Sequence, residues 1–155
     1  MRHRTQAVLN RAHNRAGNAM LEFALGSAVL VAAFAGTFQF GYTFLQYNNL
    51  VNAVARGARY ASLVPYDSAT TTPSSAFSSA VQNMVLYGSP TAGSTPVLNN
   101  LKTENVSLTV TFTNGVPSAM KVSVTGYAIN SVFGKVALTS KPSITYTYQG
   151  IWSPV

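Results

Sequence analysis

Cysteine is absent from this chain of 155 residues, and acids and histidines are scarce. Without cysteine there is no disulfide framework, no thiolate nucleophile and no Cys-based metal site. The acids are Glu22, Asp67 and Glu104, and the histidines are His3 and His13. Outside the N-terminal region the acids are Asp67 and Glu104 alone, and they are far apart in the sequence. Two such acids cannot form a catalytic triad, a carboxylate pair or a His-carboxylate metal site. We therefore expect no enzymatic activity, no cofactor and no bound metal.

Charge is missing from Phe23 to Ala55, and the stretch from Phe23 to Leu45 is almost wholly apolar. This run exceeds the roughly 20 residues that cross a bilayer as a helix. The region before it, residues 1–17, carries four arginines and no acid. A basic flank of this kind stays in the cytoplasm, so the rest of the chain should face outward. A basic tail can also bind nucleic acid, but no aromatic side chains for base stacking are interleaved here, and we expect no such partner.

Proline is missing before Pro65, which predicts one continuous helix from about Asn18 to about Leu63. At 1.5 Å per residue this helix would be roughly 70 Å long, about twice the hydrocarbon thickness, so its second half must leave the membrane. That half is amphipathic, with an apolar stripe on which a domain can dock. The stripe consists of Leu50, Val54, Ala58 and Ala61, and the polar residues Asn49, Asn52, Arg56 and Arg59 share another face.

Small side chains recur at every fourth position of the apolar half, at Ala24, Ala28, Ala32 and Gly36. This spacing aligns them along one edge, where another helix backbone can approach closely in lipid. The alternative, that Ala and Gly are simply common in membrane helices, stays open.

Two arginines, Arg56 and Arg59, flank Gly57 about three turns beyond the apolar run. They are placed to contact anionic headgroups or an acidic group of a partner. The alternative is a solvated polar face without a partner.

The region after the long helix, residues 64–155, combines one short helix with strands. The sequence SSAFSSAVQNMVLYG predicts about three helical turns that end in a C-capping glycine, Gly88. Alternating apolar residues predict strands at about 106–112, 121–127 and 143–149. The expected fold class is α+β: a long N-terminal helix, transmembrane in its first half and amphipathic in its second, packed against a small antiparallel sheet with a short extra helix.

Glu22 stands directly before the apolar run, where a carboxylate is costly unless it has a partner. If the chain is cut after Gly17, Asn18 becomes the first residue and Glu22 the fifth. Arg15-Ala16-Gly17, followed at this distance by Glu22-Phe23, resembles the processing site of type IV prepilins. There a membrane peptidase cuts on the cytoplasmic side of the apolar segment, and the helix survives cleavage, unlike a secretory signal.

A longer stretch resembles one branch of that superfamily. GNAMLEFAL at the start and NAVARGARYA after the apolar run are similar to the TadE-like minor pilins, or pseudopilins, of tight-adherence pilus systems. The resemblance covers about Arg15 to Ala61, and its most specific feature is Gly17 and Glu22 combined with Arg56-Gly57-Ala58-Arg59. The C-terminal β region resembles the family only in general pattern.

The resemblance implies a pilin-like fold, a cleaved leader at 1–17, a helix at 18–63 that spans the membrane at about 23–45, and an exterior domain at 64–155. A prepilin peptidase would recognise Gly17, and Glu22 and Phe23 would act in assembly. The implied partners are other pilin or pseudopilin subunits, the pilus assembly platform and the bacterial inner membrane, crossed once with the N-terminus in the cytoplasm. Many type IV pilins begin with an N-methylated Phe, whereas this chain would begin with Asn18.

Charge pairing gives Glu22 a physical role in this scheme. Cleavage creates an α-amine one helical turn away, and in an assembly of parallel helices Glu22 of one subunit could neutralise the amine of its neighbour. A first-turn acid also complements the helix dipole without any partner.

Two other functions fit parts of the sequence. Ala33-Phe34-Ala35 before Gly36 suits a signal peptidase, which would make the chain a secreted or periplasmic binding domain, although the apolar run continues to Leu45. An uncleaved single-span anchor with a sensor or adhesin domain is the second alternative.

Overall fold

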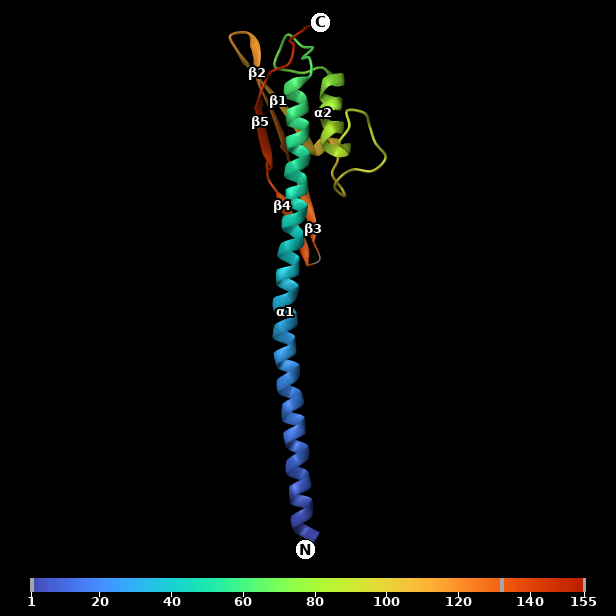
Figure 1. Ribbon diagram of the computed structural model, residues 1–155, viewed down its shortest axis with the longest axis vertical. Coiled ribbons are helices and arrows are strands. Elements are labelled where there is room, and N and C mark those ends of the chain that lie inside the picture. The colour runs from blue at the N-terminus through green and yellow to red at the C-terminus, as the bar shows by residue number, and fades with distance from the viewer. Residues whose placement is uncertain (1, 132, 155) are drawn as a thin grey trace. The chain divides into compact units, whose positions relative to one another are not determined.

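The chain forms two compact units, Met1–Gly41 and Tyr42–Val155. The structure, a computed structural model, describes the backbone of residues 2–131 and 133–154 and the side chains of residues 17–131 and 133–154. Helix α1 (Arg2–Leu63) contributes to both units, and the second unit adds a short helix and two small antiparallel sheets (Figure 1). The expected α+β class is confirmed.

The N-terminal unit consists of α1 alone. The helix begins at Arg2 and not at about Asn18, where we expected it to start. The difference has a simple cause, because residues 2–17 contain no proline, and extending an existing helix avoids the cost of nucleation. The basic side chains of the expected leader, Arg2, Arg4, Arg11 and Arg15, lie outside the described side chains.

The C-terminal unit is built on the second half of α1. Leu50, Val54, Ala58 and Ala61, the expected docking stripe, are all fully buried, and Ala53 joins them. The expected polar face is exposed at Asn49, Asn52, Arg56 and Arg59. The amphipathic pattern therefore predicted correctly which side of the helix the domain covers.

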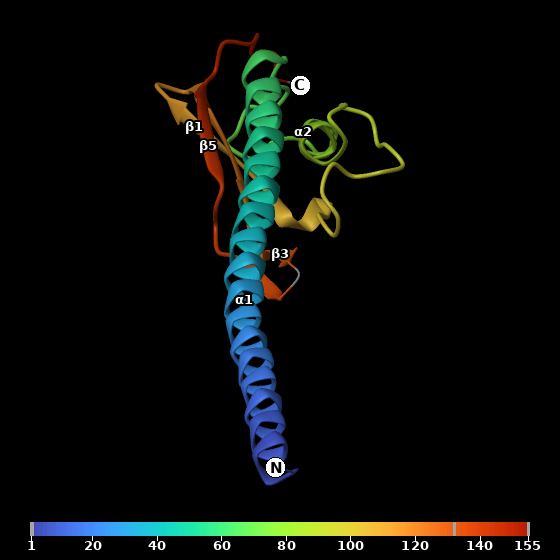
Figure 2. The same ribbon diagram turned by 60° about the horizontal axis from the view of Figure 1, so that its bottom comes forward.

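Helix α2 (Ser75–Tyr87) packs beside α1 (Figure 2). Ser74 caps its first turn, with its hydroxyl accepting a hydrogen bond from the Phe77 N–H. Gly88 caps the other end in the left-handed conformation, at φ 72°, as expected from the sequence. Phe77, Val81 and Val85 form its buried face, which repeats at the helical period.

The main sheet has three strands in the order β1-β2-β5, all antiparallel. After the 3₁₀ turn η1 (Thr103–Asn105), β1 (Val106–Thr113) and β2 (Val116–Val124) form a hairpin. Asn114 and Gly115 make its turn at positive φ. The third strand, β5 (Ser143–Thr147), pairs with β2. The inner face contributes Val110, Met120, Val122 and Val124 to the core.

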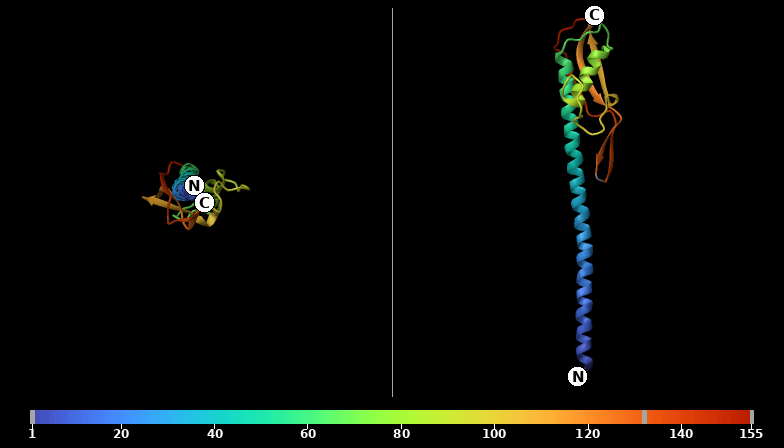
Figure 3. Two further views of the ribbon diagram at one scale, coloured as in Figure 1. Left: turned by 90° about the horizontal axis from the view of Figure 1, so that it is seen from below. Right: turned by 90° about the vertical axis from the view of Figure 1, so that its right-hand side faces the viewer.

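A second sheet, β3 (Tyr127–Ser131) with β4 (Gly134–Leu138), was not expected. The strand expected at 121–127 is present only in part, because β2 runs from Val116 to Val124 and β3 begins at Tyr127. Gly126 lies between them at φ 66°, a left-handed conformation that interrupts a strand. The two-stranded sheet lies beside α1, displaced along it from the main sheet (Figure 3).

An aromatic cluster joins the end of α1 to the C-terminal segment. Tyr66 is fully buried and makes edge contacts with Phe77, Phe112 and Tyr148. The Tyr148 hydroxyl accepts a hydrogen bond from the Tyr66 N–H at 2.8 Å and lies 2.8 Å from the Ile151 carbonyl oxygen. Burial raises the pKa of both Tyr66 and Tyr148. The cluster holds the C-terminal segment against the domain.

Candidate functional site

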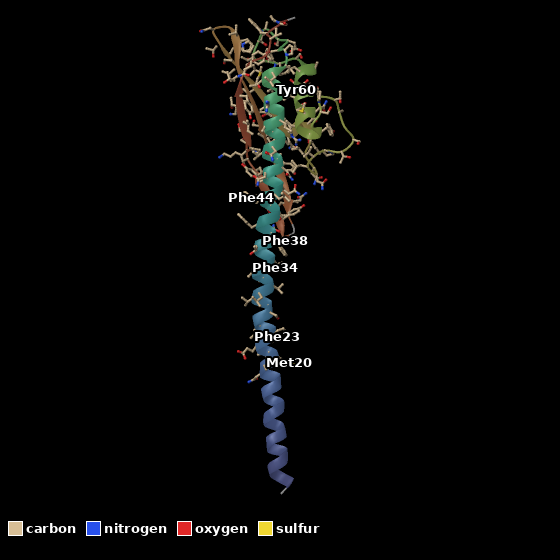
Figure 4. The ribbon with its side chains drawn as sticks, in the orientation of Figure 1. Met20, Phe23, Phe34, Phe38, Phe44 and Tyr60 are labelled. Carbon is tan, nitrogen blue, oxygen red and sulfur yellow. The ribbon has the colours of Figure 1, made fainter. Side chains whose placement is uncertain are left out.

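The N-terminal unit displays the candidate processing and assembly residues on an open helix surface. Gly17, Asn18, Glu22 and Phe23 are all exposed, and Phe23 retains 77% of its surface (Figure 4). No ion pair involves Glu22 within the described part of the chain. The carboxylate and the ring next to it are therefore available to another molecule.

The small-residue edge is open as well. Ala24, Ala28, Ala32 and Gly36 are exposed, and a Cβ added at Gly36 would meet no atom within 4 Å. Their spacing places them along one edge of α1, where they leave a shallow strip without large side chains.

The helix around this edge has the character of a membrane span. Its best 18-residue window has a mean hydropathy of 1.8, and it is long and apolar enough to cross a bilayer. Two hydroxyls within it are satisfied by the helix itself. Ser27 Oγ donates to the Ala24 carbonyl at 2.9 Å, and Thr37 Oγ1 donates to the Ala33 carbonyl at 3.0 Å. The exposed apolar side chains include Met20, Leu21, Phe23, Leu25, Val29, Leu30, Val31, Phe34, Phe38 and Phe40.

In the C-terminal unit the exposed face of α1 forms the floor of an open hollow of about 480 Å³. Arg56 and Arg59 lie in it, and neither makes an ion pair among the described residues. Tyr146 of β5, which is 40% exposed, forms part of the wall. Asn49, Asn52, Ala55 and Val97 complete the lining. Tyr146 and Val97 were not expected at this site, because the sheet and the loop after α2 bring them there from distant parts of the sequence.

The acids of the C-terminal unit lie elsewhere and are engaged. The Ser74 hydroxyl donates to Asp67, and Glu104 forms an exposed ion pair with Lys102 at 3.3 Å. The two arginines thus present positive charge that the described part of the domain does not neutralise.

Gly57, between the two arginines, is buried against α2. A Cβ at this position would lie 2.3 Å from Val85 Cγ2 and 3.5 Å from the Val81 carbonyl oxygen. The glycine therefore lets α2 approach the backbone of α1 between Arg56 and Arg59. The sequence alone identified Gly57 only as part of a motif.

Within the described residues, no group of three or more His, Cys, Asp or Glu side chains is close enough to hold a metal ion. The N-terminal unit exposes an apolar helix with one carboxylate, and the C-terminal unit exposes a basic hollow. These features are suited to contacts with lipid and with other protein chains.

Comparison with known proteins gives a family match for part of α1. Residues 17–59 match the family described as TadE-like protein, which confirms the resemblance for this segment. The matched segment begins at Gly17 and ends at Arg59, so it contains the candidate residues on α1. Curated proteins and solved structures give no match.

Proposed function

We propose, from the premise that residues 17–59 are a TadE-like segment, that this chain is a minor pilin, or pseudopilin, of a tight-adherence type IV pilus. A prepilin peptidase removes residues 1–17, and the mature subunit takes part in pilus assembly and so supports surface adhesion. The observation that carries the proposal is the exposed Glu22 directly before an apolar, membrane-capable helix inside the matched segment.

Processing on the cytoplasmic side leaves the apolar helix in the mature protein. Gly17 is exposed, and a Cβ there would meet no described atom within 4 Å, so a substitution at this position does not disturb the packing of the chain itself. A Gly17→Val change should therefore leave membrane insertion intact and stop cleavage. Retention of the leader would be seen as a heavier band in the membrane fraction.

Glu22 pairs with the α-amine of a neighbouring subunit. An unpaired charge between parallel helices in lipid is energetically costly. The Glu22 carboxylate and the neighbouring α-amine neutralise each other, so neither charge is left unpaired. The small-residue edge of Ala24, Ala28, Ala32 and Gly36 allows the helices to approach closely enough for that pairing.

The Glu22→Gln change tests this pairing, because it keeps the shape and removes the charge. We expect normal amounts in the membrane and a loss of about tenfold in sheared pili, the ratio that corresponds to about 1.4 kcal/mol. Glu104→Gln, at an exposed acid of the C-terminal unit, is the matched control and should change neither fraction. Equal incorporation of the Glu22→Gln variant and the control would remove the pairing from the account.

Arg56 and Arg59 contact an acidic group of a partner subunit or of the assembly platform. Arg56 lies about 16 Å along the helix axis beyond Leu45, whereas a headgroup layer is only about 6 Å deep. The distance therefore favours a protein carboxylate over lipid. Charge-assisted contacts of this kind are stronger than neutral hydrogen bonds.

Replacing both arginines by glutamine should lower incorporation into pili and leave the unfolding transition of the full chain unchanged, since both side chains are exposed. Lys121→Gln on the exposed side of β2 is the control for a loss of positive charge. Incorporation at the control level would show that the arginines form only a solvated face.

A further inference from the structure

Part of α1 belongs to the C-terminal unit, beginning at Tyr42. The β3–β4 hairpin lies beside the first turns of that part (Figures 1 and 3). Ser131, the last residue of β3, pairs with Gly134, the first residue of β4. The Ser131 hydroxyl is 3.1 Å from the Thr43 hydroxyl of α1. Thr43 belongs to the apolar run that ends at Leu45. The tip of the hairpin is therefore level with the outer end of the proposed membrane span.

The sequence of this tip is unusual for a hairpin turn. Two-residue connections are usually built from Asn, Asp or Gly, and the other hairpin of the domain has Asn114-Gly115. Between Ser131 and Gly134 the sequence reads Val132-Phe133. Phe133 is 68% exposed, which is costly in water for a large aromatic side chain. An exposed apolar residue where turn chemistry favours a polar one indicates a contact outside the domain.

The surroundings of the tip indicate what that contact is. Lys135 follows Phe133 closely and is exposed, and Tyr42 and Phe44 are exposed on α1 at the same level. Aromatic side chains collect at the boundary between hydrocarbon and headgroups, and lysines next to them reach lipid phosphates. A hairpin with this composition at this level fits a lipid surface.

We propose that the tip of the β3–β4 hairpin is a second membrane contact of this protein. Phe133 inserts into the headgroup and acyl boundary of the bilayer that α1 spans, and Lys135 lies against the headgroups. The inference rests on the proposed function, which places α1 in the membrane. Because the domain is packed on the second half of α1, a second contact at one side of the helix favours one direction of tilt of α1 in the bilayer.

Because the chain has no cysteine, single cysteines can report the depth of chosen positions. Phe133→Cys, labelled with an environment-sensitive fluorophore, is measured in the full chain reconstituted into phosphatidylcholine–phosphatidylglycerol vesicles. Two quenchers are used: lipids with a nitroxide near the headgroup, which reach labels at the membrane boundary, and lipids with a nitroxide deep in the acyl chain, which reach labels near the middle of the bilayer. Val116→Cys is the matched control, since it is an exposed apolar residue at the β1–β2 turn, at the opposite end of the domain (Figure 1). Phe34→Cys marks the proposed span.

We expect the headgroup quencher to reduce the fluorescence at residue 133, the acyl-chain quencher to reduce it at residue 34, and neither to change it at residue 116. Lys135→Cys should be quenched as well, which guards against a local effect of the substitution at 133. Quenching at 34 with none at 133 or 135 would overturn the hairpin contact and leave the span intact. No quenching at 34 would instead remove the span on which the inference rests. If the label at residue 133 becomes shielded from water only after pilus assembly, the hairpin tip contacts a second subunit. That result would overturn the lipid contact.

Discussion

At the scale of single residues, hydroxyl groups decide how the C-terminal segment is held. Tyr148 illustrates this, because its ring packs against Tyr66 while its hydroxyl lies within hydrogen-bonding distance of the Ile151 carbonyl. Buried tyrosines of this kind retain their protons more strongly in the folded state than in the unfolded state. Their contribution to stability is therefore present below the unfolded pKa of about 10 and is lost as the pH rises through the higher folded pKa.

We therefore expect the free energy of unfolding of the full chain in detergent to fall above pH 10 or so, with Tyr66 and Tyr148 contributing to the slope. Tyr148→Phe should lower stability at neutral pH by about 1 kcal/mol, because the hydrogen bonds of the Tyr148 hydroxyl are lost while the Tyr66 N–H keeps the Ile151 carbonyl oxygen as an acceptor at 2.9 Å. The same change should make the alkaline decline less steep. Denaturant titrations over a pH series measure both effects. An unchanged alkaline slope in the variant would contradict the role given to Tyr148.

At the scale of the elements, the contact between α1 and α2 depends on Gly57. A methyl group at this position would overlap Val85. Overpacking in a core costs about 1–3 kcal/mol. The better helix propensity of Ala offsets only about 1 kcal/mol of that cost. We therefore expect Gly57→Ala to lower the free energy of unfolding. Val85→Ala removes the overlapping group, so Gly57→Ala should be less costly in that background. Additive effects in this double-mutant cycle would show that the two residues do not constrain each other.

The elements also show where the sequence was sufficient. Periodicity and caps predicted the buried stripe of α1, helix α2 and strand β1, since each has one covered face and clear end signals. The β3–β4 sheet escaped prediction because β4 is exposed at four of its five positions, so no alternation marks it. The break at Gly126 was missed because a single glycine within an alternating run also fits a continuous strand.

At the scale of the whole molecule, local sequence motifs located the candidate residues on α1, and tertiary structure supplied their surroundings. Glu22 and the arginine pair could be identified from their spacing along one helix. Tyr146 and the hairpin tip at Phe133 could not, because chain topology brings them beside α1 from far along the sequence. We propose that α1 is a processed membrane helix and that the exposed surfaces of the C-terminal unit contact neighbouring molecules.

The N-terminal residue of the mature protein tests this account most directly. Mass spectrometry of the membrane fraction, from cells that carry the matching peptidase, identifies it. We predict Asn18, the residue after Gly17, with the whole apolar helix retained. A mature chain that begins at Gly36 would mean that the apolar run was a signal peptide, and one that begins at Met1 would mean an uncleaved anchor. Either result would contradict the pilin mechanism.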